Sequence, residues 1–505
     1  MTFQRASGIL LHPTCLPSPF GIGDLGQSAY EFIDFLDRSG QTLWQILPLG
    51  PTGYEHSPYI MNFSTFAGNP LLISLDQLAE QGLLNADELT PLPPSEDVTP
   101  NRVNFDRVIP HKTEFLQRAF DRFRESLSGN PNPEFESFCQ ETSAWLEDYA
   151  LFMALLEAHN GLPWNKWDSA IARREPEAMK AKSEELADRI LYHKFLQFKF
   201  FEQWRNLRRY ANDKGISIIG DISIYVCHNS SDVWAQPNIF QLNPETLESA
   251  YIAGVPPDYF SETGQLWGNP VYDWDELKRT GFSWWIERFK ATLAYADLVR
   301  IDHFRGFEAY WRVPAGEETA MNGEWIKGPD REFFEAIRQG LGSLPVLAED
   351  LGIITPEVEA LRDSFEFPGM KILQFAFADT PKNPYLPHNF VQNCLVYTGT
   401  HDNDTTVGWW QQAGEPEKQH VTQYLGYSHP DEVKEIHWEF IGLALKSVAN
   451  QAIIPLQDLL GLDNKGRMND PSINAGNWRW RYESSDQLTS EISDRLLHLT
   501  KLYNR

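Results

Sequence analysis

Four carboxylates in this sequence stand at the ends of short apolar runs. Asp221 interrupts "SIIGDISIYV", Asp302 closes "LVRID", Glu349 is the second-last residue of "PVLAED" and Asp402 closes "CLVYTGTHD". If these runs are parallel strands of one barrel, their carboxyl ends converge on one face, where active sites lie. A single carboxylate at such a position usually caps a helix or holds a loop. Four of them favour a catalytic cluster.

Paired carboxylates acting on a neutral, hydroxyl-rich substrate are typical of glycosyl transfer, which needs one protonated acid and one ionised partner. Arg300 lies two residues before Asp302, so an extended strand places both side chains on the same face. The cation favours the ionised form of Asp302. Glu349 can serve as the acid, because an apolar site and repulsion from Asp302 both raise the pKa of a carboxyl group.

The sequence pattern around these residues predicts alternating strands and helices. Near-continuous apolar runs, which are typical of parallel strands buried on both faces, occur at 44–50, 70–76, 217–226, 298–302, 345–350, 370–377, 394–402 and 452–460. Amphipathic segments at 332–341 and 355–365 predict helices between the later runs. The pattern predicts an α/β fold, a single (β/α)₈ barrel over residues 1–505.

Two connections are too long for simple crossovers. Residues 77–190 combine proline-rich loops with helical stretches, and we expect a mainly helical inserted subdomain there. Residues 227–290 are rich in proline, glycine and aromatic residues. We expect them to form a loop-rich lid over the barrel face that carries the carboxyl ends of the strands.

The overall composition narrows the classes of partner that the protein can bind. The 505 residues include 43 basic and 70 acidic side chains, a net charge of −27. This balance argues against nucleic acid or an anionic membrane as a partner, because both require a positive surface. Most of the many aromatic residues must belong to the core, but exposed aromatic platforms are also how proteins bind sugars. Four separated cysteines and the lack of a long apolar segment predict a cytoplasmic protein.

Three other kinds of site are disfavoured. "GIGDLG" at 21–26 has the glycine spacing of a dinucleotide loop but follows two prolines instead of a strand. "THDND" at 400–404 lacks the further oxygen ligands of a hard-metal loop. No GxSxG motif indicates acyl-enzyme chemistry.

Several motifs then match one family. "CLPSPFGIGDLG", "HSPYIMNFSTFAGNPLLISLD", "PDYFSETGQLWGNPVYDW", "VRIDHFRGF", "LAEDLG", "FPGMKILQFAF" and "YTGTHDNDT" resemble the 4-α-glucanotransferases (amylomaltases, or disproportionating enzymes) of glycoside hydrolase family 77, in the α-amylase clan. The matches run from about residue 8 to "GNWRWR" at 476–481, so they cover nearly the whole chain.

The resemblance implies a role for individual residues. Asp302 corresponds to the nucleophile, Glu349 to the acid/base and Asp402 to the stabiliser of the transition state. The positions implied to bind substrate are Arg300, His303, His401, Asp221, Tyr59, Tyr259, Phe260, Trp267, Asn269, Phe375 and Asp379. Of these, Tyr259, Phe260 and Trp267 belong to the lid. The segment 469–481 is less regular, and no subsite is assigned to it.

The implied reaction is retaining transfer of α-1,4-glucan segments from maltooligosaccharides to the 4-hydroxyl of glucose or a glucan, with possible formation of cyclic glucans. It predicts a covalent glycosyl intermediate on Asp302 and carboxyl groups about 5–5.5 Å apart. We expect no cofactor and no metal, and a monomer or weak homodimer. A hydrolase of the same clan remains an alternative. A non-catalytic glucan-binding protein would lack one of the three carboxylates. Arg305 is expected to support its loop instead of touching substrate.

Overall fold

The computed structural model describes residues 3–53, 56–59, 62–94, 99–127, 129, 131–257, 261–473 and 475–505. Two predicted lid residues, Tyr259 and Phe260, lie outside these ranges.

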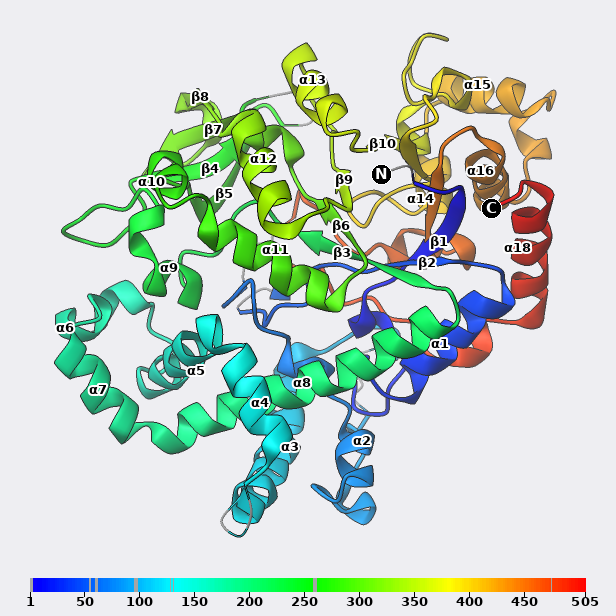
Figure 1. Cartoon of the computed structure of the whole chain (residues 1–505). Helices are drawn as coiled ribbons and strands as arrows, with labels where there is room; N and C mark the ends of the chain where they lie inside the picture. Colours follow the sequence, from blue (N-terminus) through cyan, green and yellow to red (C-terminus); the bar gives the residue numbers. More distant parts are fainter. Residues whose placement is uncertain are drawn as a thin grey trace.

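Eight parallel strands form the centre of the molecule (Figure 1). In barrel order they are β1 (Ala6–Leu10), β2 (Leu43–Gln45), β3 (Ser217–Ile222), β6 (Leu298–Ile301), β9 (Val346–Ala348), β10 (Gly369–Ile372), β11 (Cys394–Tyr397) and β12 (Gln451–Pro455). β12 pairs with β1, and the Ala348 N–H of β9 donates to the Pro368 carbonyl, 3.0 Å away and directly before β10. The predicted (β/α)₈ barrel is therefore confirmed.

One predicted strand was wrong and one was missed. Residues 70–76 form a 3₁₀ turn, Pro70–Leu72, and the start of α2 (Leu75–Glu80). The Asn69 side chain accepts from the Leu71 N–H and the Ser74 hydroxyl from the Gln77 N–H, so both turns are capped and a helix replaces the strand. The eighth strand is β1, a short run with a glycine at its centre that carries little strand signal.

Helices cover the barrel between successive strands. They include α1 (Gln27–Arg38), α8 (Ala187–Asp213), α11 (Ser283–Tyr295), α12 (Asp330–Leu341), α13 (Pro356–Ser364), α16 (Ile436–Lys446) and α18 (Ser490–Leu502). Two of these, α12 and α13, were predicted from their amphipathic pattern. In α12 the buried face consists of Phe333, Phe334 and Ile337, spaced three to four residues apart as a helix requires.

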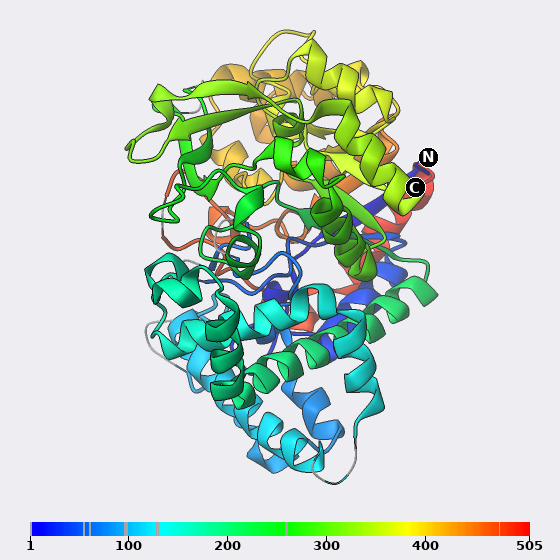
Figure 2. The same ribbon diagram turned by 60° about the vertical axis from the view of Figure 1, so that its left-hand side comes forward.

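The connection between β2 and β3 is mostly helical. It contains α2, α3 (Phe105–Leu127), α4 (Pro133–Glu141), α5 (Ser143–Ala158), α6 (Ser169–Ala172) and α7 (Pro176–Glu185) before α8. Figure 2 shows these helices gathered at the lower end of the molecule, in cyan and blue-green, below the barrel.

The connection between β3 and β6 carries α9 (Ser231–Ala235), β4 (Tyr251–Val255), β5 (Gln265–Pro270) and α10 (Trp274–Arg279). β4 and β5 join two later strands, β7 (Ala309–Pro314) and β8 (Glu324–Lys327), in an antiparallel sheet of order β5-β4-β7-β8. Segments on either side of Asp302 in the sequence therefore form one sheet beside the barrel.

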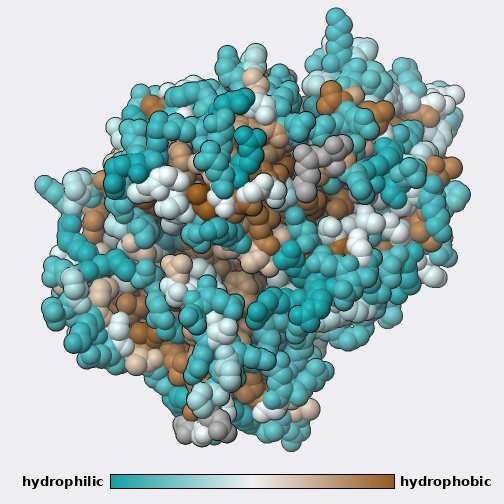
Figure 3. Space-filling view, in the orientation of Figure 1, coloured by the Kyte–Doolittle hydropathy of each residue, from teal (hydrophilic) through white to brown (hydrophobic). Residues whose placement is uncertain are grey.

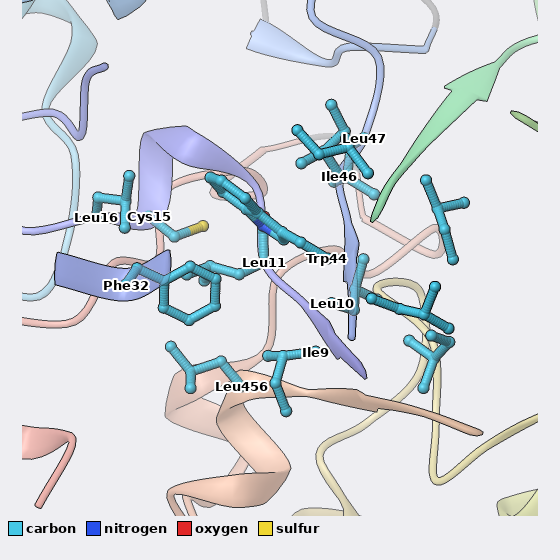
Figure 4. Close-up of a cluster of buried hydrophobic side chains, with 14 of the residues drawn as sticks. Ile9, Leu10, Leu11, Cys15, Leu16, Phe32, Trp44, Ile46, Leu47 and Leu456 are labelled. Atoms are coloured by element: carbon cyan, nitrogen blue, oxygen red, sulfur yellow. The ribbon is translucent and has the colours of Figure 1, made fainter. Parts of the chain in front are cut away.

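Apolar side chains from β1 and β2 fill one side of the barrel core. Ile9, Leu10 and Trp44 pack near Phe32 of α1 (Figure 4). Trp44 is fully buried, and its Nε1–H donates to the Leu11 carbonyl at 2.8 Å, so its one polar atom is satisfied. In the described part of the chain, no helix combines the length and the apolar character needed to cross a membrane.

Gly8 allows β1 and β2 to approach closely. A Cβ atom there would lie 2.1 Å from the Leu43 carbonyl oxygen, which is backbone and cannot move aside. We expect Gly8→Ala to destabilise the protein by about 1–3 kcal/mol, as overpacked cores do. Thermal unfolding should show a lower midpoint.

Gly442, inside α16, is the matched control, because a Cβ there meets nothing within 4 Å. Gly442→Ala should raise the stability by about 0.5–1 kcal/mol. Equal midpoints for the two variants would contradict the packing argument.

Candidate active site

A buried arginine joins two of the predicted carboxylates. Asp221 in β3 and Arg300 in β6 are direct cross-strand partners. The Arg300 Nη1 lies 2.7 Å from Asp221 Oδ2, and its Nη2 lies 2.9 Å from Asp302 Oδ1. The sequence-based prediction that Arg300 and Asp302 share a face is confirmed, and strand pairing adds Asp221.

Burial and charge act against each other in this triad. The side chains of Arg300 and Asp221 are 5% and 0% exposed, whereas that of Asp302 is 28% exposed. Burial raises the pKa of Asp221 to about 7 against the opposing attraction of Arg300. Burial opposes the charge on Arg300, but Asp221 and Asp302 outweigh it and raise the pKa of this guanidinium above its usual value. Both carboxylates pair with Arg300, and Asp302 is the one that is partly exposed.

Glu349 lies at the end of the neighbouring strand, β9. Its Oε2 accepts from the His303 N–H at 2.7 Å, and its Oε1 accepts from the Leu351 N–H at 2.9 Å. Burial and, after it, the negative charge of Asp302 raise the pKa of Glu349 to about 7. Arg300 and the two N–H donors favour the charged form, but burial outweighs them. Glu349 is therefore partly protonated near neutral pH.

Asp402 follows β11 on the opposite side of the barrel mouth. Its Oδ1 accepts from Asn469 Nδ2 at 2.7 Å and lies 3.3 Å from His401 Nε2. Its side chain is 45% exposed, so the carboxylate is held at one oxygen and open to the cleft. Burial lowers the pKa of His401, which is therefore neutral at pH 7.

Arg467 fixes the loop that carries Asp402. Its Nη2 donates to the Asp402 carbonyl at 2.7 Å, its Nη1 lies 2.6 Å from Asp404 Oδ1, and its Nε donates to the Asn469 carbonyl at 2.8 Å. The Asn469 N–H donates back to the His401 carbonyl at 3.0 Å. Asp404, considered as a metal ligand from the sequence, is thus engaged in an ion pair.

Sequence reasoning missed Arg467 and Asn469. Asn469 begins the segment 469–481, to which no subsite was assigned, and Arg467 lies two residues before it. Trp478, from the same segment, is also part of the site. Its ring centroid lies 5.8 Å from those of Tyr59 and His401.

Tyr59 connects the two halves of the site. Its hydroxyl donates to Asp221 Oδ2 at 2.8 Å, and its ring stacks on His401 at 5.0 Å with an interplanar angle of 8°. The structure therefore brings together Tyr59, Asp221, Arg300, Asp302 and His401.

Trp267 and His303 lie at the edge of the same region. The Trp267 ring meets His303 edge-on at 4.8 Å. His303 adopts a left-handed backbone conformation (φ 51°), its Nε2 is buried without a hydrogen-bond partner, and burial lowers its pKa to about 3. A neutral imidazole with a free nitrogen suits a hydroxyl ligand.

Three predicted substrate-binding residues have other contacts. Asn269 is buried, and its Nδ2 donates to the Val226 carbonyl at 2.8 Å, so this amide nitrogen binds the main chain of a neighbouring segment. The Phe375 ring meets Tyr385 edge-on at 5.6 Å. Asp379 is exposed and accepts from the Thr380 N–H at 2.6 Å.

Known proteins share this architecture and sequence. The family model described as 4-alpha-glucanotransferase matches residues 11–487. The chain belongs to this family. It is 57% identical over 507 residues to a 4-alpha-glucanotransferase of Synechocystis, covering 100% of this chain and 99% of that protein. It is 50% identical over 486 residues to that of Thermus thermophilus, covering 95% of each.

A solved amylomaltase of Streptococcus agalactiae, in complex with acarbose, superposes with a TM-score of 0.94 at 38% identity, over 99% of this chain and 100% of that one. The resemblance predicted from the motifs is confirmed, and the chain is an enzyme of the 4-alpha-glucanotransferase family.

We expect Arg467→Lys to lower kcat, because a lysine keeps the charge but cannot bind Asp402, Asp404 and Asn469 at once. A displaced Asp402 should cost up to about 100-fold in kcat. Steady-state kinetics on maltotriose measure the loss. Arg495→Lys, at an exposed pair with Glu435, is the matched control and should leave kcat unchanged. Equal kcat for both variants would contradict the role of Arg467.

Proposed function

We propose that this enzyme transfers α-1,4-glucan segments from a maltooligosaccharide to the 4-hydroxyl of glucose or another glucan, with retention of configuration and through a covalent glycosyl–Asp302 intermediate. One observation carries the proposal. Glu349, whose pKa burial raises to about 7, stands beside Asp302, which is ion-paired with Arg300. Retaining transfer needs this pairing of a protonated acid with an ionised nucleophile.

In the first step, Glu349 gives its proton to the glycosidic oxygen while an Asp302 oxygen attacks the anomeric carbon. The C–O bond to the leaving chain breaks, and the leaving chain departs with a neutral hydroxyl. Arg300 binds Asp302 Oδ1, at 2.9 Å, so the carboxylate is held in one orientation for attack. Loss of the Glu349 proton leaves a carboxylate that accepts two backbone N–H bonds.

In the second step, that Glu349 carboxylate takes the proton of an acceptor 4-hydroxyl, whose oxygen attacks the anomeric carbon. The bond to Asp302 breaks, and the two carboxyl groups return to their first states. Two inversions at one carbon give net retention.

The residues around the pair suit the charge and shape of the reacting sugar. Asp402 presents an open carboxylate oxygen that stabilises positive charge on an oxocarbenium-like ring. His303 Nε2 and the Tyr59–His401 stack offer a polar and an aromatic surface for its hydroxyls and apolar face. Trp267, against His303, shields the intermediate from water, which favours transfer over hydrolysis.

Incubation with maltotriose tests the reaction. We expect a ladder of shorter and longer chains with little net gain in reducing ends, and Asp302→Asn should lower the rate by at least about 10³-fold. Accumulation of reducing ends would instead identify a hydrolase.

The covalent intermediate is tested with an α-maltosyl fluoride, whose fluoride leaves without acid help. Glu349→Gln should then accumulate a protein whose mass is increased by one maltosyl unit, because no base activates the acceptor. Glu349→Gln combined with Asp302→Asn should show no increase. A mass increase in the double variant would refute Asp302 as the nucleophile.

A further inference from the structure

Trp325 is a large, partly exposed aromatic side chain on β8, which is an edge strand of the four-stranded antiparallel sheet. It lies on β8 opposite Trp311 of β7, and the two rings meet edge-on at 5.3 Å. Although its ring contacts that of Trp311, the Trp325 side chain is 40% exposed. Two further exposed apolar side chains belong to the same region: Ile353, 56% exposed, and Met321, 56% exposed, in the turn that leads into β8.

Arg305 locks Trp325 to the loop that carries Ile353. Its guanidinium carbon lies 4.0 Å from the centroid of the Trp325 ring, and its Nη1 donates to the Ile353 carbonyl. Arg305 itself is only 7% exposed. It supports its loop, as the sequence predicted, and it also holds one face of an exposed aromatic ring.

Short connections lead from this surface to the catalytic acid. Ile353 lies two residues after Leu351, whose N–H binds Glu349 Oε1. Arg305 lies three residues after Asp302, in the 3₁₀ turn Phe304–Phe307. Arg305 therefore ties Trp325 and Ile353 to the two loops that follow Asp302 and Glu349. Because Glu349 must face the oxygen of the leaving group, the loop that follows it borders the leaving-group and acceptor side.

A glucan chain fits this surface better than a charged partner does. Its glucose units are neutral and present apolar C–H faces between polar edges, which match an aromatic ring bordered by charged side chains. The charged group that the structure places against the ring is Arg305, whose guanidinium carbon lies 4.0 Å from the ring centroid. The pair of Arg312 with Glu324, 2.8 Å apart, lies on the other face of the sheet, because side chains alternate along β7 and β8. Figure 3 shows that the side of the molecule seen in Figure 1 is largely hydrophilic, with apolar atoms gathered towards its middle.

We propose that Trp325 and Ile353, flanked by Met321, form an outer binding platform for glucose units of the leaving and acceptor chains, beyond the units that contact Glu349. The platform sets the preference for long over short acceptors. This inference rests on the proposed function, since it assigns the occupant as an α-1,4-glucan.

Chain-length kinetics test the platform. Trp325→Ala should raise KM for a long maltodextrin about tenfold and KM for maltotriose by less than about threefold, because only the long chain reaches Trp325. Trp325→Phe, which keeps an aromatic ring, should restore most of the discrimination. Leu162→Ala, at an exposed apolar residue of the helical connection (44% exposed), is the matched control and should change neither KM.

Binding without turnover gives a second readout. In the Glu349→Gln background, mobility in an amylose-containing native gel should increase when Trp325 is replaced by Ala, and unfolding midpoints should stay equal. The platform would be refuted if the ratio of KM for maltotriose to KM for the long maltodextrin were the same in Trp325→Ala and in the native enzyme. It would also be refuted if Trp325→Ala changed the oligomeric state instead of this ratio. If the native enzyme fails to disproportionate maltotriose, the proposed function itself fails.

Discussion

The ion pairs of Arg300 are the interaction on which the site depends. A guanidinium group that is 5% exposed is tolerated only when carboxylates compensate its charge, because an unpaired charge in a protein interior is strongly unfavourable. Asp221 and Asp302 provide this compensation from two positions. The contact with Asp221 exists because β3 and β6 pair with Asp221 opposite Arg300. A shift of one residue in this register would turn one of the two side chains to the other face of the sheet. The register of the barrel strands therefore determines whether the charge of Arg300 is compensated in the active site.

The carboxylates around Arg300 differ in burial and in the charges next to them. Two acids share one arginine, and the fully buried one, Asp221, has its pKa raised to about 7, whereas the more exposed Asp302 faces the cleft. The charge on Asp302 then disfavours ionisation of Glu349, whose pKa burial already raises. A negative charge on Asp302 therefore favours the protonated form of Glu349, as the proposed mechanism requires. Across the barrel mouth, Asn469 binds the Asp402 carboxylate and Arg467 binds the Asp402 carbonyl.

The sequence predicted those features of the fold and the site that depend on residues close together in the chain. The period of two along β6 predicted that Arg300 and Asp302 share a face, and apolar runs predicted seven of the eight barrel strands. The run at 70–76 misled because Asn69 and Ser74 cap turns, and apolar content alone does not separate a buried helix from a strand. Contacts between distant segments had no local signal. Arg467 meets Asp402 across 65 residues, and Trp325 meets Arg305 only through the folding of β8.

The coupling of Glu349 to Asp302 is the central claim, and a titration tests it most directly. Carbon-13 NMR of the glutamate carboxyl groups, with the Glu349 signal assigned by its loss in Glu349→Gln, follows its protonation against pH. We predict a midpoint near pH 7, because burial and Asp302 raise the pKa of Glu349, and a lower midpoint in Asp302→Asn, where burial remains but the repulsion from Asp302 is lost. A Glu349 midpoint near 4.5 in the native enzyme, or one that Asp302→Asn leaves unchanged, would contradict the account.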